Sequence, residues 1–153
     1  MPRRRPGALR AEPAIHPAGP DELPIRMHRV SLRTSLAIGR VERCSHDYFI
    51  FPGVTRLALG RYRAFLRPLG RRPRYPAEYG CGCRRSRLDD VRHARLILTR
   101  VLELLPARER GEFGRLLRPL DDRYRRCTLP DPFADRRPWR GAFWWYRRLG
   151  AEL

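Results

Sequence analysis

The stretch LDDVRHARLILTRVLELLPARERGEFGRLLRPLDDRYRRC, residues 88–127, decides the fold class of this chain. Its apolar residues recur every three or four positions, which is the spacing of one face of an α-helix. Pro106 divides the stretch, and proline is favoured at the first position of a helix. Two helices, over about 88–105 and 107–127, are therefore expected to form an αα-hairpin.

Local signals refine this hairpin. Ser86 lies three residues before Asp89, which predicts a capping box at the start of the first helix. Pro119 lies inside the second helix and is expected to kink or break it. Cys127 continues the apolar stripe of the second helix and is interpreted as a core residue.

Acidic residues of the hairpin have an ordinary structural interpretation. Asp89, Asp90 and His93 share a helix face, which is half of a catalytic or metal arrangement. No second histidine or nucleophile completes it, so we interpret them as helix-capping acids beside a surface histidine. Asp121 and Asp122 are expected to be exposed and to pair with neighbouring arginines.

The chain before the hairpin carries a third amphipathic stretch, which predicts a helix over about 54–69. Residues 1–24 are rich in Pro, Ala and Arg and are expected to form a flexible tail. Residues 25–127 then form a basic helical domain. A short β element is expected where apolar residues alternate with polar or small ones, at Val30, Leu32, Leu36 and Ile38. The expected fold is mainly α, a small three-helix core with this β element on its N-terminal side.

The last segment, residues 128–153, is rich in aromatic residues and is expected to pack on the helical domain. Trp and Arg together are also favoured in the centres of protein interfaces. We expect about half of these rings to close the core, and assign Trp139, Trp144 and Trp145 as candidate partner contacts.

Charge is the second strong feature of the sequence. The 153 residues contain 34 arginines, 16 acids and no lysine, asparagine or glutamine, for a net charge of +18. Arginine has GC-rich codons, so part of the arginine content reflects genomic composition. The excess is nevertheless uneven, because residues 25–87 hold 15 arginines against three acids, a net charge of +12.

A loop over residues 71–87 concentrates this charge. Arginine pairs bidentately with phosphate, and tyrosine can stack on bases. The candidate phosphate-binding residues are Arg71, Arg72, Arg74, Arg84, Arg85 and Arg87, and Tyr75 and Tyr79 are the candidate stacking residues. The alternative is a solvated loop without a specific ligand.

Cysteines suggest a second hypothesis. Cys44, His46, Cys81 and Cys83 together would supply the ligands of a tetrahedral Cys3His zinc site. Both local pairs have a single intervening residue, whereas two to four is the common spacing. Free structural thiols and a redox pair that involves Cys44 are the alternatives.

Motifs of the common enzyme classes are not found: there is no Gly-rich phosphate loop, dinucleotide fingerprint, nucleophile elbow or paired-histidine helix. No run of apolar residues is long enough for a membrane span. We therefore expect a cytoplasmic, non-enzymatic accessory protein that binds nucleic-acid phosphates and needs no cofactor or small-molecule substrate. The alternative is a protein-interaction module that docks an acidic partner through the basic face and the C-terminal tryptophans.

Overall fold

The computed structural model describes residues 26–67, 72–78, 83–137 and 143–151. These residues contain no β-strand, so the prediction of a mainly α fold is confirmed. Within the same ranges, every helix is too short or too polar to cross a bilayer. The helices are α1 (Leu32–Cys44), α2 (Val54–Phe65), α3 (Val91–Leu104) and α4 (Ala107–Cys127). Short 3-10 turns are η2 (Ser86–Asp89), η3 (Ala134–Arg136) and η5 (Trp144–Arg147).

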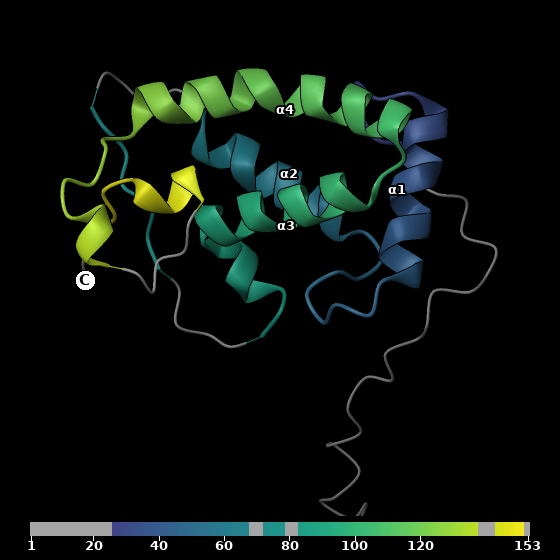
Figure 1. The fold of residues 1–153 in the computed structure, drawn as a ribbon, viewed down its shortest axis with the longest axis horizontal. Coiled ribbons are helices and arrows are strands. Elements are labelled where there is room, and N and C mark those ends of the chain that lie inside the picture. The colour runs from purple at the N-terminus through teal and green to yellow at the C-terminus, as the bar shows by residue number, and fades with distance from the viewer. Residues whose placement is uncertain (1–25, 68–71, 79–82, 138–142, 152–153) are drawn as a thin grey trace, which may run out of the picture.

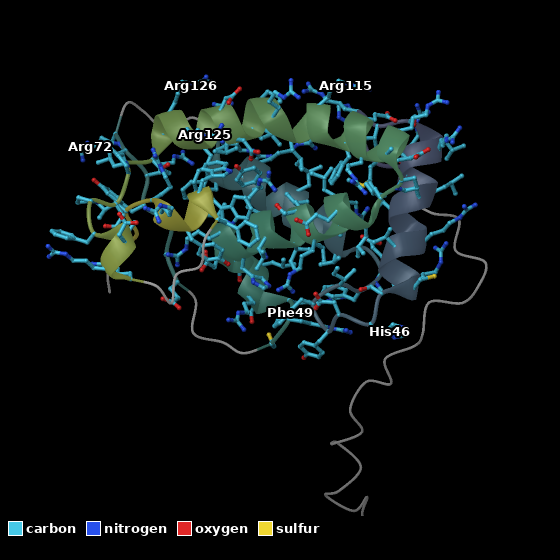
Figure 2. All side chains as sticks on the ribbon, in the orientation of Figure 1. His46, Phe49, Arg72, Arg115, Arg125 and Arg126 are labelled. Atoms are coloured by element: carbon cyan, nitrogen blue, oxygen red, sulfur yellow. The ribbon has the colours of Figure 1, made fainter. Side chains whose placement is uncertain are left out.

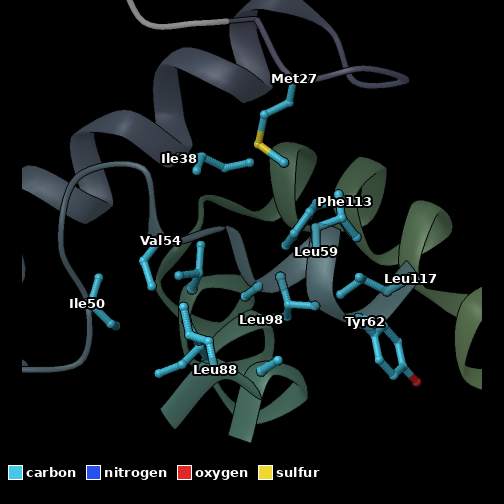
Figure 3. Packing of buried hydrophobic residues seen from close by; sticks show 14 of the residues in the cluster. Met27, Ile38, Ile50, Val54, Leu59, Tyr62, Leu88, Leu98, Phe113 and Leu117 are labelled. Atoms are coloured by element: carbon cyan, nitrogen blue, oxygen red, sulfur yellow. The ribbon is translucent and has the colours of Figure 1, made fainter. Parts of the chain in front are cut away.

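Helices α3 and α4 form the expected hairpin, with α2 packed on α3 beneath the long α4 (Figure 1). Helix α1 lies near the corner between α3 and α4 and contacts α4, α3 and α2. The core between them consists of buried apolar side chains, and Figure 3 shows part of its packing. Its largest fully buried side chains include Tyr62, Tyr124, Phe113, Ile97 and Leu98.

Helix α1 replaces the β element that the alternation around residues 30–38 predicted, so that prediction is wrong. Thr34 and Ile38 are buried and lie four residues apart, as on one helix face, whereas Leu32 is exposed. Ser31 is the N-cap, and its Oγ accepts a hydrogen bond from the amide of Thr34 at 3.2 Å. The amide and Oγ of Ser31 donate to the Glu112 carboxylate of α4 at 2.6 and 2.8 Å, which fixes the start of α1 on α4.

Helix α2 is also capped by a carboxylate from another helix. Its N-cap is Gly53, which has no side chain to accept a bond and has a φ of 84°, a left-handed conformation that glycine adopts readily. Glu42 of α1 takes over the capping role, because its carboxylate accepts from the amides of Gly53 and Thr55 at 2.7 and 2.8 Å. Long-range capping of this kind joins two helices while it satisfies free amides.

The three predicted helices are confirmed with small shifts of their ends, but the predicted capping box is wrong and Pro119 does not break its helix. Asp90, and not a Ser86–Asp89 capping box, caps α3 by accepting from the amide of Arg92 at 2.9 Å. The Ser86 hydroxyl donates instead to the carbonyl of Cys83 at 3.2 Å. Pro119 does not break α4, which continues to Cys127.

Asp121 is the centre of a buried network, which corrects its expected exposure. Its carboxylate accepts two bonds from the Arg95 guanidinium, each at 2.7 Å, and one from the Tyr62 hydroxyl at 2.8 Å. The guanidinium carbon of Arg95 also lies 4.7 Å from the centroid of the Trp145 ring. The carboxylate of Asp121 thus links α2, α3 and α4. Arg95 also links η5 to this network through its contact with Trp145. Asp122 follows the prediction, since it pairs with Arg125 at 3.2 Å on the surface.

We predict that Asp121→Asn destabilises the fold far more than Asp122→Asn. The first change leaves the buried Arg95 guanidinium without a counter-charge, so a loss of about 3 kcal/mol in the free energy of unfolding is expected. The second change removes an exposed ion pair and should lose about 0.5 kcal/mol or less. Urea unfolding of both variants measures the difference, and equal losses would show that the network is not stabilising.

Candidate functional site

Three arginines of the predicted loop stack on aromatic rings from the turn between α1 and α2. The guanidinium carbon of Arg84 lies 4.6 Å from the ring centroid of Phe51 and 5.6 Å from that of Tyr48. Arg85 lies 5.9 Å from Phe51. Arg87 lies 5.4 Å from the ring centroid of Phe49, the residue labelled in Figure 2. We call this cluster the arginine–aromatic face: Tyr48, Phe49, Phe51, Arg84, Arg85 and Arg87.

Asp47 positions the aromatic part of this face. Its carboxylate accepts from the amide of Phe49 at 2.9 Å, and its carbonyl accepts from the amide of Ile50 at 2.9 Å. Arg100 of α3 pairs with the same carboxylate at 2.6 Å. The turn is therefore fixed on α3, and Tyr48 projects from it with 61% of its surface exposed.

Positive charge on the face is not neutralised. Within the described parts of the chain, Arg84, Arg85 and Arg87 make no hydrogen bond or ion pair through their side chains. A cation–π contact uses none of the five N–H donors of a guanidinium. The three groups are thus held by rings and keep their donors for an anion.

The six predicted phosphate-binding arginines do not all lie in one place in the structure. Arg74 lies near the C-terminal end of α4, where its amide donates to the carbonyl of Cys127 at 2.7 Å, and its guanidinium lies 5.8 Å from the centroid of Phe65. Arg72 is exposed and lies far from Phe49 across the molecule (Figure 2). Arg72 and Arg74 therefore lie apart from the cluster of Arg84, Arg85 and Arg87, and their assignment as phosphate-binding residues stays a prediction. Arg71 lies outside the described residues.

The predicted stacking residues also change. Tyr75 is exposed but lies beside Arg74, within the same short segment, and has no aromatic partner among the described residues. Tyr79 lies outside these residues. Tyr48 is the exposed ring that contacts Arg84, and the sequence did not identify it as a candidate because its arginine partner lies far along the chain. Its signal was an aromatic run directly after the polar residues 45–47.

The proposed zinc ligands are only partly described. Cys44 and His46 are exposed, Cys83 contacts the Ser86 hydroxyl, and Cys81 lies outside the described residues. Among the residues that are described, no three His, Cys, Asp or Glu side chains gather as metal ligands. Cys127 is half-buried against the core. The zinc hypothesis depends on Cys81 and stays a prediction.

Trp144 and Trp145, the two C-terminal tryptophans that the structure describes, pack against the core. Trp145 is only 3% exposed and stacks on Phe143 at 4.6 Å between ring centroids, so its assignment as a partner contact is corrected. Trp144 is half-buried between Tyr124 and Arg125, whose guanidinium carbon lies 4.0 Å from its ring centroid. Trp139 lies outside the described residues. Burial of these rings follows from the contact of Trp144 with Tyr124 of α4 and of Trp145 with Arg95 of α3, which the local sequence does not show.

His93 lies beneath the arginine–aromatic face and is buried, with 6% exposure, whereas the sequence suggested a surface histidine. Its ring packs edge-on against Phe49 at 5.0 Å between centroids, and its Nε2 has no hydrogen-bond partner within the described residues. Burial, followed by the positive charge of Arg87, lowers the pKa of His93 to about 4.

Comparison with known proteins finds no relative: no family model, no curated protein and no solved structure matches this chain. Any functional conclusion therefore depends on the residues of the chain itself. The arginine–aromatic face brings together three of the six sequence-predicted phosphate-binding arginines, namely Arg84, Arg85 and Arg87.

We predict that His93 makes the fold sensitive to mild acid. Its pKa is lowered from 6.5 in the unfolded chain to about 4 in the fold, so the unfolded chain takes up the proton first. The stabilising effect of the neutral ring is complete above about pH 6.5 and is lost as the pH falls toward 4. Urea unfolding at a series of pH values measures this loss.

His93→Leu should flatten the pH dependence of stability between about pH 6.5 and 5, because the titrating group is removed. His28→Gln is the matched control, since His28 is exposed and its replacement should leave the slope of the native chain unchanged. A His93→Leu variant that keeps the native slope would contradict the assignment.

Proposed function

We propose that the protein is a non-enzymatic accessory protein that binds a single-stranded nucleic acid through the arginine–aromatic face. The observation that carries this proposal is the set of three guanidiniums that are held on aromatic rings and have no carboxylate partner. An exposed tyrosine beside unneutralised arginines is the combination that single-strand-binding proteins use, with stacking on the bases and cations on the backbone.

Phosphate oxygens are suitable acceptors for this face. Arg85 and Arg87 are exposed, and Arg84 is half-buried between the rings of Tyr48 and Phe51. Each guanidinium can offer a pair of parallel N–H donors to one phosphate. Because the rings already restrict the arginine side chains, less conformational entropy is lost when a phosphate binds.

The exposed ring of Tyr48 is the reason that a single strand is proposed as the ligand and not a duplex. An unpaired base exposes its flat face to a protein ring, whereas a base inside a duplex is already stacked on its neighbours. The chain has no asparagine or glutamine, the usual side chains for reading adenine. Binding is therefore expected to depend on backbone and stacking contacts, with little base preference.

Binding should weaken with salt, because each phosphate contact releases counterions. Single strands contribute a slope of about −0.7 per contact, so three contacts predict a slope of about −2 in log affinity against log salt concentration. Fluorescence anisotropy of labelled single-stranded DNA and RNA over a salt series measures this slope. Binding that is absent or independent of salt would contradict the proposal.

Matched variants test the face itself. Arg85→Ala/Arg87→Ala should weaken binding and reduce the salt slope by about 1.4, because two contacts are lost. Arg108→Ala/Arg118→Ala removes the same charge from exposed positions of α4 and should have little effect. Tyr48→Ala should weaken binding by about 1 kcal/mol or more while the salt slope stays unchanged. Equal losses in the two arginine pairs would show that net charge alone drives binding.

A further inference from the structure

A second basic surface lies along α4, on the opposite side of the molecule from Phe49 (Figure 2). A groove of about 550 Å³ separates α4 from the end of α2 and from the turn before α1. We call it the α4 groove. Its positive residues are Arg29, Arg63, Arg115, Arg123 and Arg126.

Positive charge in the α4 groove is not balanced. None of its five arginines makes an ion pair or a side-chain hydrogen bond among the described residues. Glu112, the one carboxylate among the described lining residues, is occupied by the amide and hydroxyl of Ser31 and the hydroxyl of Thr34. Burial, followed by the positive charge of Arg29, lowers the pKa of Arg63.

The floor of the groove is apolar, in contrast to its rim. Leu116, Pro119 and Leu120 line it. Leu116 and Leu120 are half-buried against the core, and Pro119 is exposed. Among the described residues that line the groove, none is aromatic. An arginine rim around an apolar floor fits carboxylates and aliphatic side chains of one ligand better than it fits a nucleic-acid strand, which would find no ring for stacking.

We propose that the α4 groove docks an acidic segment of a partner protein, in which carboxylates pair with the arginine rim and apolar side chains cover Leu116, Pro119 and Leu120. Charge complementarity selects the occupant, because five unpaired guanidiniums favour an anionic ligand. This site is separate from the arginine–aromatic face, so a partner and a nucleic acid can be bound at the same time. The inference does not depend on nucleic-acid binding.

Two labelled peptides of equal negative charge test the proposal on the full chain. One carries leucines at helical spacing among glutamates, and the other is polyglutamate. The first should bind at least about tenfold more tightly, because only it covers the apolar floor. Equal affinities would reduce the groove to a non-specific positive surface and would overturn the proposal, as would the absence of peptide binding.

Charge-reversal variants locate the peptide. Arg115 and Arg123 are exposed, so Arg115→Glu/Arg123→Glu should leave the fold intact and weaken binding of the leucine-containing peptide at least about tenfold. Arg108→Glu/Arg118→Glu changes the net charge equally, outside the groove, and should weaken binding much less. Equal losses in the two pairs would contradict docking in the groove.

Competition separates this inference from the proposed function. Arg85→Ala/Arg87→Ala should keep its affinity for the leucine-containing peptide, even if it no longer binds single-stranded DNA. An unlabelled single-stranded oligonucleotide should not displace the peptide from the native chain. If it does, and if Arg115→Glu/Arg123→Glu selectively loses oligonucleotide binding, the groove is a nucleic-acid surface and the proposal is wrong.

Discussion

The carboxylate of Asp121 is the constraint on which the arrangement of the helices depends. It accepts hydrogen bonds from Tyr62 of α2 and from Arg95 of α3, and its own helix is α4. Arg95 also packs on Trp145, which brings the C-terminal segment to the same point. A buried charge is unfavourable unless it is paired and fully bonded, so these elements must keep their mutual register. Because the helices are held in one arrangement, the surrounding aromatic rings pack in defined positions.

Scarce carboxylates in this chain have structural roles inside the molecule. Glu42 caps α2, Glu112 anchors the start of α1, and Asp90 caps α3 while it pairs with the buried Arg92. Acids used in this way are not available to neutralise surface arginines. Since 16 acids face 34 arginines, the unpaired positive charge collects on the outside. Other acids pair with exposed arginines, as Asp122 does with Arg125, but there are fewer than half as many acids as arginines.

These surfaces differ in what surrounds their arginines. On the arginine–aromatic face the guanidiniums lie over rings, and an exposed tyrosine projects beside them. In the α4 groove the guanidiniums surround aliphatic side chains. Rings favour flat ligands that can stack, whereas an aliphatic floor favours side chains of a polypeptide. The two surfaces lie on opposite sides of the molecule (Figure 2).

The sequence by itself determined the helical hairpin and the excess of arginine. The apolar stripe of residues 88–127 has helical spacing over many turns, and that signal is local. Tertiary structure alone decided that residues 32–44 are a helix, that Asp121 and His93 are buried, and that Tyr48 joins Arg84. Each of these depends on a contact between residues far apart in the chain, such as Ser31 with Glu112 or Arg95 with Asp121. A local pattern shows which face of a segment is apolar. The hydrogen-bond or ion-pair partner of a polar side chain is determined only when the helices pack together.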